Sequence, residues 1–403
     1  MAALSETEFA EKWLDNFEVV DRPTAKLLLD NLFLVSASDF QMGLNELLER
    51  LLKDNQENLP VSLYAEREPP RGPFFEGSAQ GRAKGPGPAA LPYGTKDKMV
   101  GSEGPIANLI KGFCNKHAST VFSHSGPDQL RSKKVRRVVL VTDLIGSGKR
   151  IFELLDSFSS VATLRSWRSY GLIKFSVVAY CYTVAGRAKV ESHPWCDDIL
   201  VRHAVPTLNN CFRGAERASM ISLCKRYDPA KHSRLPLGFL DTGALIAFSH
   251  GVPNNAPSIL HWQSDDWNAL FPRRSASGSV VDQFRTPEDE VRRRCVDMLK
   301  VETLRSELRL FHGSRGRQVA LVLAALRSGR RSESDVSALT RMPVEVTREI
   351  LSLLIDVGWA TEKCSLTELG RRELRRVSRF QYVHGRIEFP VDEYYFPNQL
   401  RAR

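Results

Sequence analysis

The residues best suited to chemistry form one short stretch near the middle of the chain. Asp143 precedes a Gly-Ser-Gly loop at 146–148, and Lys149 and Arg150 follow that loop directly. Backbone N–H groups at a glycine-rich loop and a helix N-terminus bind anions, because the helix dipole favours negative charge there. A carboxylate just before such a loop suits the hydroxyl pair of a ribose or a metal ion. The stretch therefore predicts a site for a sugar phosphate.

The elements on either side of this loop can be predicted from their apolar patterns. Residues 138–141, Val-Val-Leu-Val, form a continuous β-branched run that is typical of a strand buried on both faces. After the loop, Ile151, Leu154, Leu155 and Phe158 recur at the spacing of one helix face. The sequence thus predicts a strand, a loop and a helix N-terminus in the order that an anion site requires.

Two better-known phosphate loops do not fit this stretch. An ATP-binding P-loop of the form G-x-x-x-x-G-K-[ST] would need Gly at 143 and Ser or Thr at 150, where the chain has Asp143 and Arg150. A dinucleotide loop would need a third glycine at 151, where the chain has Ile151. Neither an ATPase nor a dinucleotide enzyme is indicated.

A second junction of loop and helix begins at residue 101. Ser102 can cap a helix there, Glu103 follows it, and Pro105 fits the first turn. The junction suits either a second anion pocket or an ordinary capped helix.

The order of the remaining elements predicts an α/β fold with a parallel sheet. Strand patterns at 61–65, 175–182 and 199–205 alternate with helical segments. A Pro- and Gly-rich stretch at 68–100 suits a loop or an active-site lid. The segment 206–272 holds the Pro253-Asn254-Asn255 turn and several aromatics, and it suits either a rim over a ligand or a packed lobe. We predict an N-terminal helical region (1–58), a catalytic-type domain (59–272), a linker (273–289), a C-terminal helical domain (290–380) and a docking tail (381–403).

The C-terminal domain has the element order of a winged helix. Helices are predicted near 317–327, from a Ser332 cap to 340, and from 344 onward, followed by a short β-wing and a last helix. Residues 315–379 hold thirteen Lys and Arg against eight Asp and Glu by count. Basic side chains neutralise nucleic-acid phosphates, and the candidates here are Arg341, Arg348, Lys363, Arg371 and Arg372. Because Glu345 and Glu349 oppose phosphates, a protein-binding module remains the alternative.

Composition sets broad limits on the protein. The 403 residues carry a formal net charge of +10, which favours an anionic partner. The seven cysteines include no CxxC pair, which favours a reducing cytoplasm over a disulfide scaffold. The spacing of His193, Cys196, His203 and Cys211 matches no zinc pattern, and no apolar run approaches the ~18 residues of a membrane span. We therefore predict no metal centre of the protein's own and no membrane segment.

The loop closely resembles the ribose-phosphate loop of the phosphoribosyltransferases. The resemblance implies that Asp143 binds the ribose hydroxyls, with Thr142 and Lys149 beside it, and makes Asp143 the catalytic candidate. It implies that Gly146, Ser147 and Gly148 bind the 5′-phosphate. One departure is that Thr142 stands where the family has the first acid of a pair. Mg²⁺ would bridge a pyrophosphate if the substrate carries one.

A longer pattern resembles the phosphoribosyltransferase-like effectors of bacterial conflict systems. It includes Trp13, Leu63-Tyr-Ala, Gly101-Ser-Glu, the loop at 143–148 and Leu270-Phe-Pro-Arg273. Some of these effectors are encoded beside retron reverse transcriptases, in a type that also has a winged-helix component. The resemblance implies a role in anti-phage defence, with retron DNA or RNA and a reverse transcriptase as partners.

Two hypotheses follow from the residues and the resemblance together. The first is an enzyme that binds a ribose-5-phosphate-type ligand and acts on the glycosidic bond of a nucleotide, favoured by the intact Asp143 loop. The second is a non-catalytic component that senses a nucleotide and binds nucleic acid or a reverse transcriptase, favoured by Thr142 at the acid position.

Overall fold

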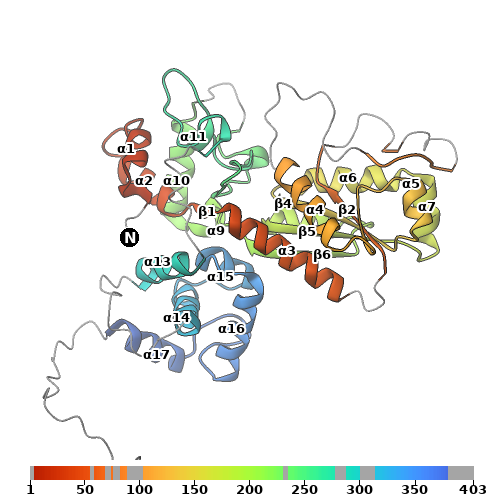
Figure 1. The fold of residues 1–403 in the computed structure, drawn as a ribbon. Coiled ribbons are helices and arrows are strands. Elements are labelled where there is room, and N and C mark those ends of the chain that lie inside the picture. Colours follow the sequence, from red (N-terminus) through yellow and green to blue (C-terminus); the bar gives the residue numbers. More distant parts are fainter. Residues whose placement is uncertain are drawn as a thin grey trace, which may run out of the picture.

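The computed structural model describes residues 4–54, 59–68, 74–75, 82–88, 103–229, 235–276, 287–299 and 314–379. Figure 1 shows a sheet with helices on both faces, a lobe at its edge and a helical C-terminal module. The predicted docking tail and most of the stretch at 68–100, predicted as a loop or an active-site lid, lie outside the described residues.

A five-stranded parallel sheet forms the centre of the molecule, in the order β3-β2-β4-β5-β6. The strands are Val61–Ala65 (β2), Val121–Ser123 (β3), Arg137–Ile145 (β4), Lys174–Tyr182 (β5) and Asp198–Ala204 (β6). Every residue of β4 after Arg137 is buried. This confirms the prediction of an α/β fold with a parallel sheet.

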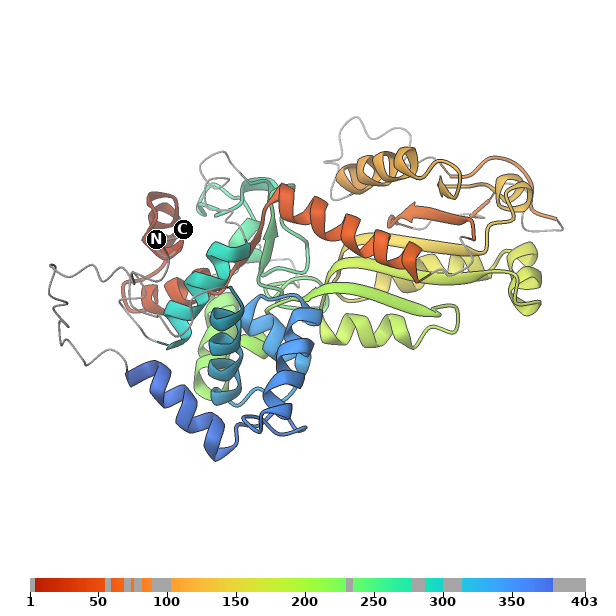
Figure 2. The same ribbon diagram turned by 60° about the horizontal axis from the view of Figure 1, so that its bottom comes forward.

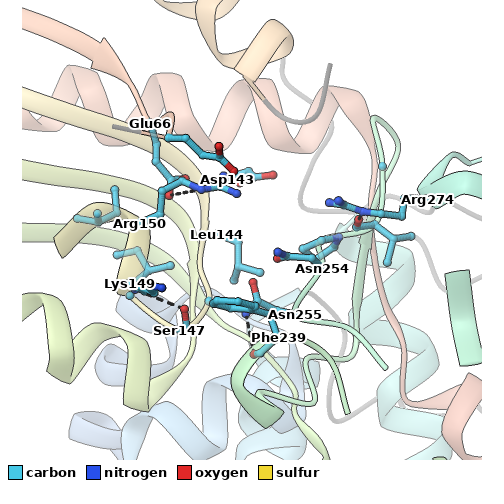
Figure 3. A pocket seen from close by; sticks show the side chains of 18 of the residues that line it. Glu66, Asp143, Leu144, Ser147, Lys149, Arg150, Phe239, Asn254, Asn255 and Arg274 are labelled. Carbon is cyan, nitrogen blue, oxygen red and sulfur yellow. Dashed lines mark hydrogen bonds and ion pairs between the residues drawn. The ribbon is translucent and has the colours of Figure 1, made fainter. Parts of the chain in front are cut away.

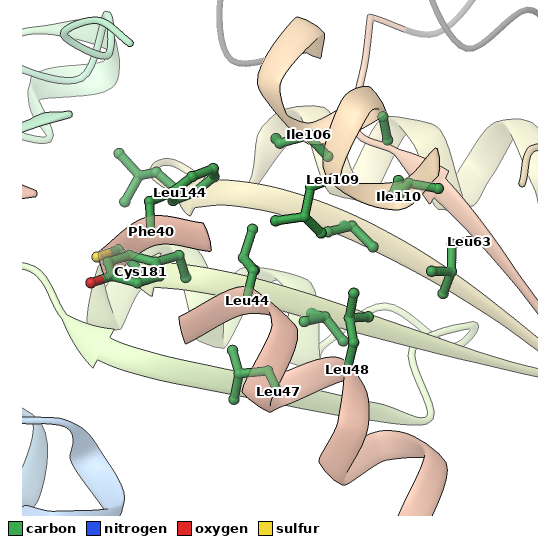
Figure 4. Close-up of a cluster of buried hydrophobic side chains, with 14 of the residues drawn as sticks. Phe40, Leu44, Leu47, Leu48, Leu63, Ile106, Leu109, Ile110, Leu144 and Cys181 are labelled. Atoms are coloured by element: carbon green, nitrogen blue, oxygen red, sulfur yellow. The ribbon is translucent and has the colours of Figure 1, made fainter. Parts of the chain in front are cut away.

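Helices cover both faces of the sheet because the strand residues alternate between them. Val139 and Val141 belong to the cluster that packs under Ala37–Lys53 (α3) and Glu103–Lys116 (α4), which Figure 4 shows. Val138 and Leu140 belong to the cluster that packs under Lys149–Ser159 (α6) on the other face. The helices of this domain are Ala37–Lys53 (α3), Glu103–Lys116 (α4), Pro127–Ser132 (α5), Lys149–Ser159 (α6), Ala162–Ser169 (α7) and Val184–Glu191 (α8).

The strand order places a topological switch point between β2 and β4. The chain leaves β2 through α4 to β3 on one side, and then returns to β4 on the other side of β2. In open parallel sheets, ligands bind in the crevice outside the carboxyl ends of the strands at such a point. Glu66, just after β2, and Asp143, near the end of β4, flank this crevice.

A lobe beside the sheet joins the N-terminal segment to residues 205–276. Trp13, Leu28, Phe212 and Trp267 share its apolar core. Its elements are Leu4–Glu6 (η1), Glu8–Leu14 (α1), Arg22–Asp30 (α2), Phe33–Val35 (β1), Leu208–Cys211 (α9), Gly214–Arg226 (α10), Phe239–Asp241 (η2), Ile246–Phe248 (β7), Ser258–His261 (α11) and Pro272–Arg274 (η3).

The N-terminal segment is not wholly helical. The short strand β1 pairs with β7, more than 200 residues further along the chain. The next helix, α3, packs onto the central sheet rather than on α1 and α2. The apolar pattern of residues 37–53 predicts α3 correctly. The three-residue strand β1 has no such pattern, because it depends on pairing with the distant strand β7.

The C-terminal module contains Pro287–Leu299 (α13), Ser314–Arg327 (α14), Glu333–Thr340 (α15), Val344–Asp356 (α16) and Glu368–Arg379 (α17). The Ser332 side chain accepts from the Asp335 N–H, which confirms the predicted cap. The predicted wing is reduced to one antiparallel bridge, Ala360 to Leu366. Helices α15 and α16 pack against the edge strand β6, and the blue module lies against the rest of the molecule in both views (Figures 1 and 2).

Within the described part of the chain, no helix has the length and apolar character needed to cross a membrane.

Candidate functional site

The loop at 146–148 is held tightly between β4 and α6. Gly148 has φ of +72°, and a Cβ there would lie 2.5 Å from the Gly186 carbonyl oxygen of α8. A Cβ on Gly146 would lie 2.2 Å from Oδ1 of Asn255. Position 148 therefore requires glycine, and a side chain at Gly146 would have to displace the Asn255 amide. The first-turn N–H groups of α6, which have no partners within the helix, end beside the loop.

Thr183, which directly follows β5, holds the loop through its backbone N–H and its hydroxyl. Its backbone N–H donates to the Ile145 carbonyl at 3.0 Å, and its hydroxyl donates to the Gly146 carbonyl at 2.6 Å. The same hydroxyl accepts from the Gly186 N–H as the cap of α8. The loop at 146–148 is thus tied by hydrogen bonds to the end of the neighbouring strand and to the first turn of α8.

A second carboxyl group lies beside Asp143, and it comes from the neighbouring strand. Glu66 is 6 % exposed and Asp143 is 8 % exposed. The Thr142 hydroxyl donates to Glu66 Oε2 at 2.5 Å and lies 3.4 Å from Asp143 Oδ1. One hydroxyl therefore connects the two acids, and Figure 3 shows Glu66 and Asp143 side by side with Arg150.

The position of Glu66 is set by backbone contacts around the end of β2. Its N–H donates to the Val141 carbonyl at 2.8 Å, which continues the pairing with β4. The Ala65 N–H before it donates to Nε2 of His124 at 3.0 Å. Burial lowers the pKa of His124 to about 4, so this ring stays neutral and keeps its acceptor at neutral pH.

Burial changes the protonation of the Glu66 carboxyl. It raises the pKa of Glu66 from 4.5 to about 7, against the opposing effects of Arg150 and the Thr142 hydroxyl. The charge of Asp143 contributes to the rise. Arg150 Nε lies 3.8 Å from Glu66 Oε1, and the carboxylate raises the pKa of that guanidinium. A carboxyl that titrates near neutral pH can take and give a proton.

The opposite wall of the cavity comes from the lobe. His250 Nε2 lies 3.3 Å from Asp143 Oδ2, and its ring stacks on Phe248 with centroids 5.0 Å apart. Asn254 and Arg274 face the acids across the cavity in Figure 3. The Arg274 Nε donates to the Val252 carbonyl at 2.7 Å, which holds the guanidinium at the rim.

Together these walls enclose a cavity of about 660 Å³. Its size lies within the range of about 300–1,000 Å³ that is typical of small-molecule sites. The charged residues that line it are Glu66, Glu68, Asp143, Lys149, Arg150, Glu153 and Arg274. Cationic groups at the loop and the rim, with acids between them, suit a phosphorylated sugar whose hydroxyls face the acids.

The structure brings most of the predicted ligand residues together. Asp143, Gly146, Ser147, Gly148 and Lys149 all line the cavity. Thr142 is fully buried, and its hydroxyl serves the two acids. Glu103 begins α4 near the cavity, where its charge contributes to the raised pKa of Glu66, and Ser102 lies outside the described residues.

Several residues of the cavity were not predicted from the sequence. The sequence alone does not assign Glu66, Arg150, His250 or Arg274 to a ligand site, and it leaves the Asn pair at 254–255 either in a rim over a ligand or in a packed lobe. Glu66 had one usable signal, since it follows the predicted strand 61–65 and parallel strands end at the same edge of a sheet. His250 and Arg274 carry no such signal, because their place depends on how the lobe packs.

The carboxyl pair also decides how the site could hold a metal ion. In the described part of the chain, no group of three or more His, Cys, Asp or Glu side chains is placed to hold one. Mg²⁺ usually needs only one or two protein carboxylates, with water and substrate phosphates completing its shell. Asp143 and Glu66 fit that kind of site, in which the substrate supplies the remaining oxygens.

The predicted nucleic-acid residues fall into two groups. Lys363, Arg371 and Arg372 are exposed. Arg348 is exposed but forms a two-pronged ion pair with Glu333 at 2.8 and 2.9 Å. Arg341 is only 5 % exposed and donates to the Asp30 carbonyl, so its guanidinium is not on a surface that a nucleic acid could reach. We leave Arg341 out of any such surface.

Comparison with known proteins adds two matches that agree with this architecture. A family model described as PRTase-CE matches residues 10–273, which is more than half of the chain. A second, described as wHTH-PRTase associated, matches residues 320–402 and is compatible with nucleic-acid binding. No curated protein and no solved structure matches the chain.

Proposed function

The chain belongs to the PRTase-CE family of phosphoribosyltransferase-like proteins, and from this premise we propose that it is an effector of an anti-phage defence system that acts on nucleotides. Its cavity binds a ribose-5-phosphate-type ligand, and its acids assist in making or breaking a glycosidic bond. The retron-associated context rests on the sequence resemblance and on the winged-helix module that follows the catalytic-type domain.

One observation carries this proposal, and it is the carboxyl of Glu66 beside Asp143. The loop motif lacks its first acid because Thr142 stands there, which weakens the case for an enzyme. Glu66 supplies a second carboxyl from the adjacent strand, and Thr142 becomes the hydroxyl that connects the two acids. A purely structural loop would have no need of two buried acids at the switch point of the sheet.

The loop, Asp143 and Glu66 each have a separate role in the proposed reaction. The loop N–H groups and Ser147 hold the 5′-phosphate, and Asp143 accepts hydrogen bonds from the ribose hydroxyls. The negative charge of Asp143 stabilises positive charge that develops on the ribose ring as the glycosidic bond lengthens. Glu66, half protonated near pH 7, gives a proton to a leaving base or takes one from an attacking group.

Mg²⁺ is part of the proposal only for a substrate that carries pyrophosphate. Asp143 and Glu66 would hold it together with phosphate oxygens, and the ion would neutralise charge on the leaving pyrophosphate. His250, 3.3 Å from Asp143, orients that carboxylate in either case.

Metabolite profiling of cells tests this function directly. Cells that express the wild-type chain or the Asp143→Asn variant, both with the remaining defence components, are infected with phage and their nucleotides are quantified. We expect a nucleotide pool to fall and a free base or ribose phosphate to rise only with the wild type. Asp265→Asn, an exposed acid in the lobe, is the matched control and should behave as wild type.

Identical profiles for wild type and Asp143→Asn would count against an enzyme. Calorimetry with ribose 5-phosphate then separates the remaining alternative. Binding that is lost in Asp143→Asn without any change in metabolites would indicate a nucleotide sensor, whereas no binding at all would reject the ligand class as well.

A further inference from the structure

A basic groove lies on the winged-helix module, far in sequence from the acid pair. It runs between the end of α14, the wing and α17, with a volume of about 500 Å³. Among the described residues, four arginines and one acid line it, which gives this lining a net charge of 4 − 1 = +3. These residues are Arg327, Arg331, Arg371, Arg375 and Glu368. We call this surface the α17 groove.

The arginines that line the α17 groove are held by hydrogen bonds within the module. Arg331 donates to the Cys364 carbonyl and to Ser365 Oγ, at 3.3 and 2.6 Å, which joins it to the wing. Arg371 and Arg375 both donate to Glu368, at 3.2 and 2.8 Å, so two cations share one acid. Leu326 and Leu374 lie buried beneath them and pack in the core of the module. The charges are therefore displayed on a fixed surface.

The helix that a winged helix ordinarily places in a DNA groove is less suited to phosphates. Helix α16 carries Glu345, Glu349 and Asp356 against one basic residue, Arg348, for a net charge of 1 − 3 = −2. Arg348 is paired with Glu333, and Glu349 is paired with Arg315 at 3.3 Å. The N-terminal residue of α16, Val344, is buried in the core of the sheet domain. The acids of α16 would therefore repel phosphates, and the first turn of the helix is covered by the sheet domain.

We propose that the α17 groove binds the sugar-phosphate backbone of a nucleic acid. Guanidinium groups match phosphate oxygens with two parallel N–H donors, so arginine is the residue of choice for such contacts. Arg371 and Arg375 lie one helical turn apart, about 6 Å along the axis, and can contact neighbouring phosphates. Lys363 is exposed on the wing, two residues before Ser365, which lines the groove. Contacts of this kind position a nucleic acid without selecting its sequence.

The proposal does not depend on the nucleotide chemistry proposed for the cavity. Its surface shares no residue with the cavity. The competing occupant is an acidic protein segment, which the same cations would attract. Nucleic acid is favoured because the module matches a winged-helix family and because the groove lining presents four arginines, whose planar guanidinium groups match phosphate oxygens.

Fluorescence anisotropy with the full-length chain tests the proposal. The probes are labelled oligonucleotides of mixed sequence, single- and double-stranded DNA and RNA, titrated at several salt concentrations from about 50 mM upward. The groove variant is Arg371→Gln with Arg375→Gln. The comparison variant, Lys116→Gln with Arg315→Gln, makes the same charge change outside the groove, where both side chains are also paired with an acid.

For wild type we expect binding that weakens steeply with salt. Each lost phosphate contact should reduce the slope of log affinity against log salt by about 0.9, which at 0.1 M salt is roughly an eightfold loss. The groove variant should therefore bind roughly 60-fold more weakly, and the comparison variant should bind within about twofold of wild type. Thermal melting of all three proteins shows whether each is folded.

Four outcomes would overturn the proposal. Wild type that binds none of the oligonucleotides at low salt would reject it. A folded groove variant with wild-type affinity, or a comparison variant that loses as much as the groove variant, would place the nucleic acid elsewhere. Tight binding of labelled poly-glutamate but of no oligonucleotide would assign the groove to an acidic protein partner instead.

Discussion

The cavity at the sheet and the α17 groove both gather charged side chains, but they do so in opposite ways. The cavity takes Glu66, Asp143, His250 and Arg274 from segments up to about 200 residues apart and buries its two central acids. The groove takes four exposed arginines from within about 50 residues of chain. Burial makes the first set strongly interdependent, whereas solvent screening makes the second set nearly additive.

This difference has a consequence for single substitutions. A buried charge is sensitive to every neighbour, because the low local dielectric strengthens each interaction and makes each loss costly. An exposed ion pair is worth little, because water and salt screen both partners. A single altered group should therefore destabilise the cavity strongly, whereas the loss of a single exposed arginine of the module should change folding stability little.

The largest expected effect tests the buried acid of the cavity. The pKa of Glu66 is about 7 in the folded chain and 4.5 in the unfolded chain. Between these two pH values the folded state keeps the proton of Glu66, whereas the unfolded state releases it. Folding stability from this group therefore falls as pH rises through that window, by up to roughly 3 kcal/mol. Glu66→Gln removes the fall, so the variant should gain stability relative to wild type from pH 5 to pH 8.

Urea unfolding of both proteins at the two pH values measures this gain. Glu68→Gln changes an exposed acid two residues away and should show no such pH dependence. If the difference between wild type and Glu66→Gln were the same at both pH values, Glu66 would be ionised throughout and the cavity would lack its proton donor.

The next effect tests the packing beneath the anion loop. A Cβ at Gly186 would lie 2.0 Å from the Gly146 carbonyl oxygen, so Gly186→Ala must displace the loop. We expect a loss of about 1–3 kcal/mol in the free energy of unfolding, together with weaker binding of ribose 5-phosphate.

The matched control for this substitution is another helical glycine, Gly112 of α4. No atom lies within 4 Å of a Cβ placed there. Gly112→Ala should therefore stabilise the protein by about 0.5–1 kcal/mol, because alanine favours the helix. Equal effects at the two positions would mean that the loop does not depend on α8.

A smaller effect tests the contact between the module and the N-terminal lobe. Arg341 is buried, and its guanidinium donates to the Asp30 carbonyl at 3.2 Å. Arg341→Gln should cost about 1.5 kcal/mol, since a hydrogen bond from a charged donor is lost. Thermal unfolding measures the loss, and unchanged stability would show that this contact does not hold the module.

The smallest expected effect concerns an exposed ion pair of the winged-helix module. Arg348 pairs with Glu333 at 2.8 Å, but its side chain is 60 % exposed. Arg348→Gln should cost less than about 1 kcal/mol, and the cost should shrink further at high salt. A loss as large as that expected for Arg341→Gln, which is buried, would break the distinction between buried and exposed charge.

The sequence by itself determined the local elements and the anion loop. The apolar run of β4, the glycines at 146 and 148 and the helix stripe of α6 are contiguous, so their pattern predicts strand, loop and helix without knowledge of the rest. The Ser332 cap and the helix order of the C-terminal module follow from local signals in the same way. Asp143 belongs to this group, since it is fixed by its distance from the loop.

Only the tertiary structure decided which side chains meet Asp143. Glu66 reaches it through the register of β2 against β4, and His250 reaches it through the packing of the lobe. The strand β1 and the burial of Arg341 likewise depend on partners far along the chain. Such contacts leave no periodic trace in the sequence, because they depend on how elements that are separate in the chain come to lie together. The acid missing from the loop motif was therefore found on the neighbouring strand, where only the folded sheet could place it.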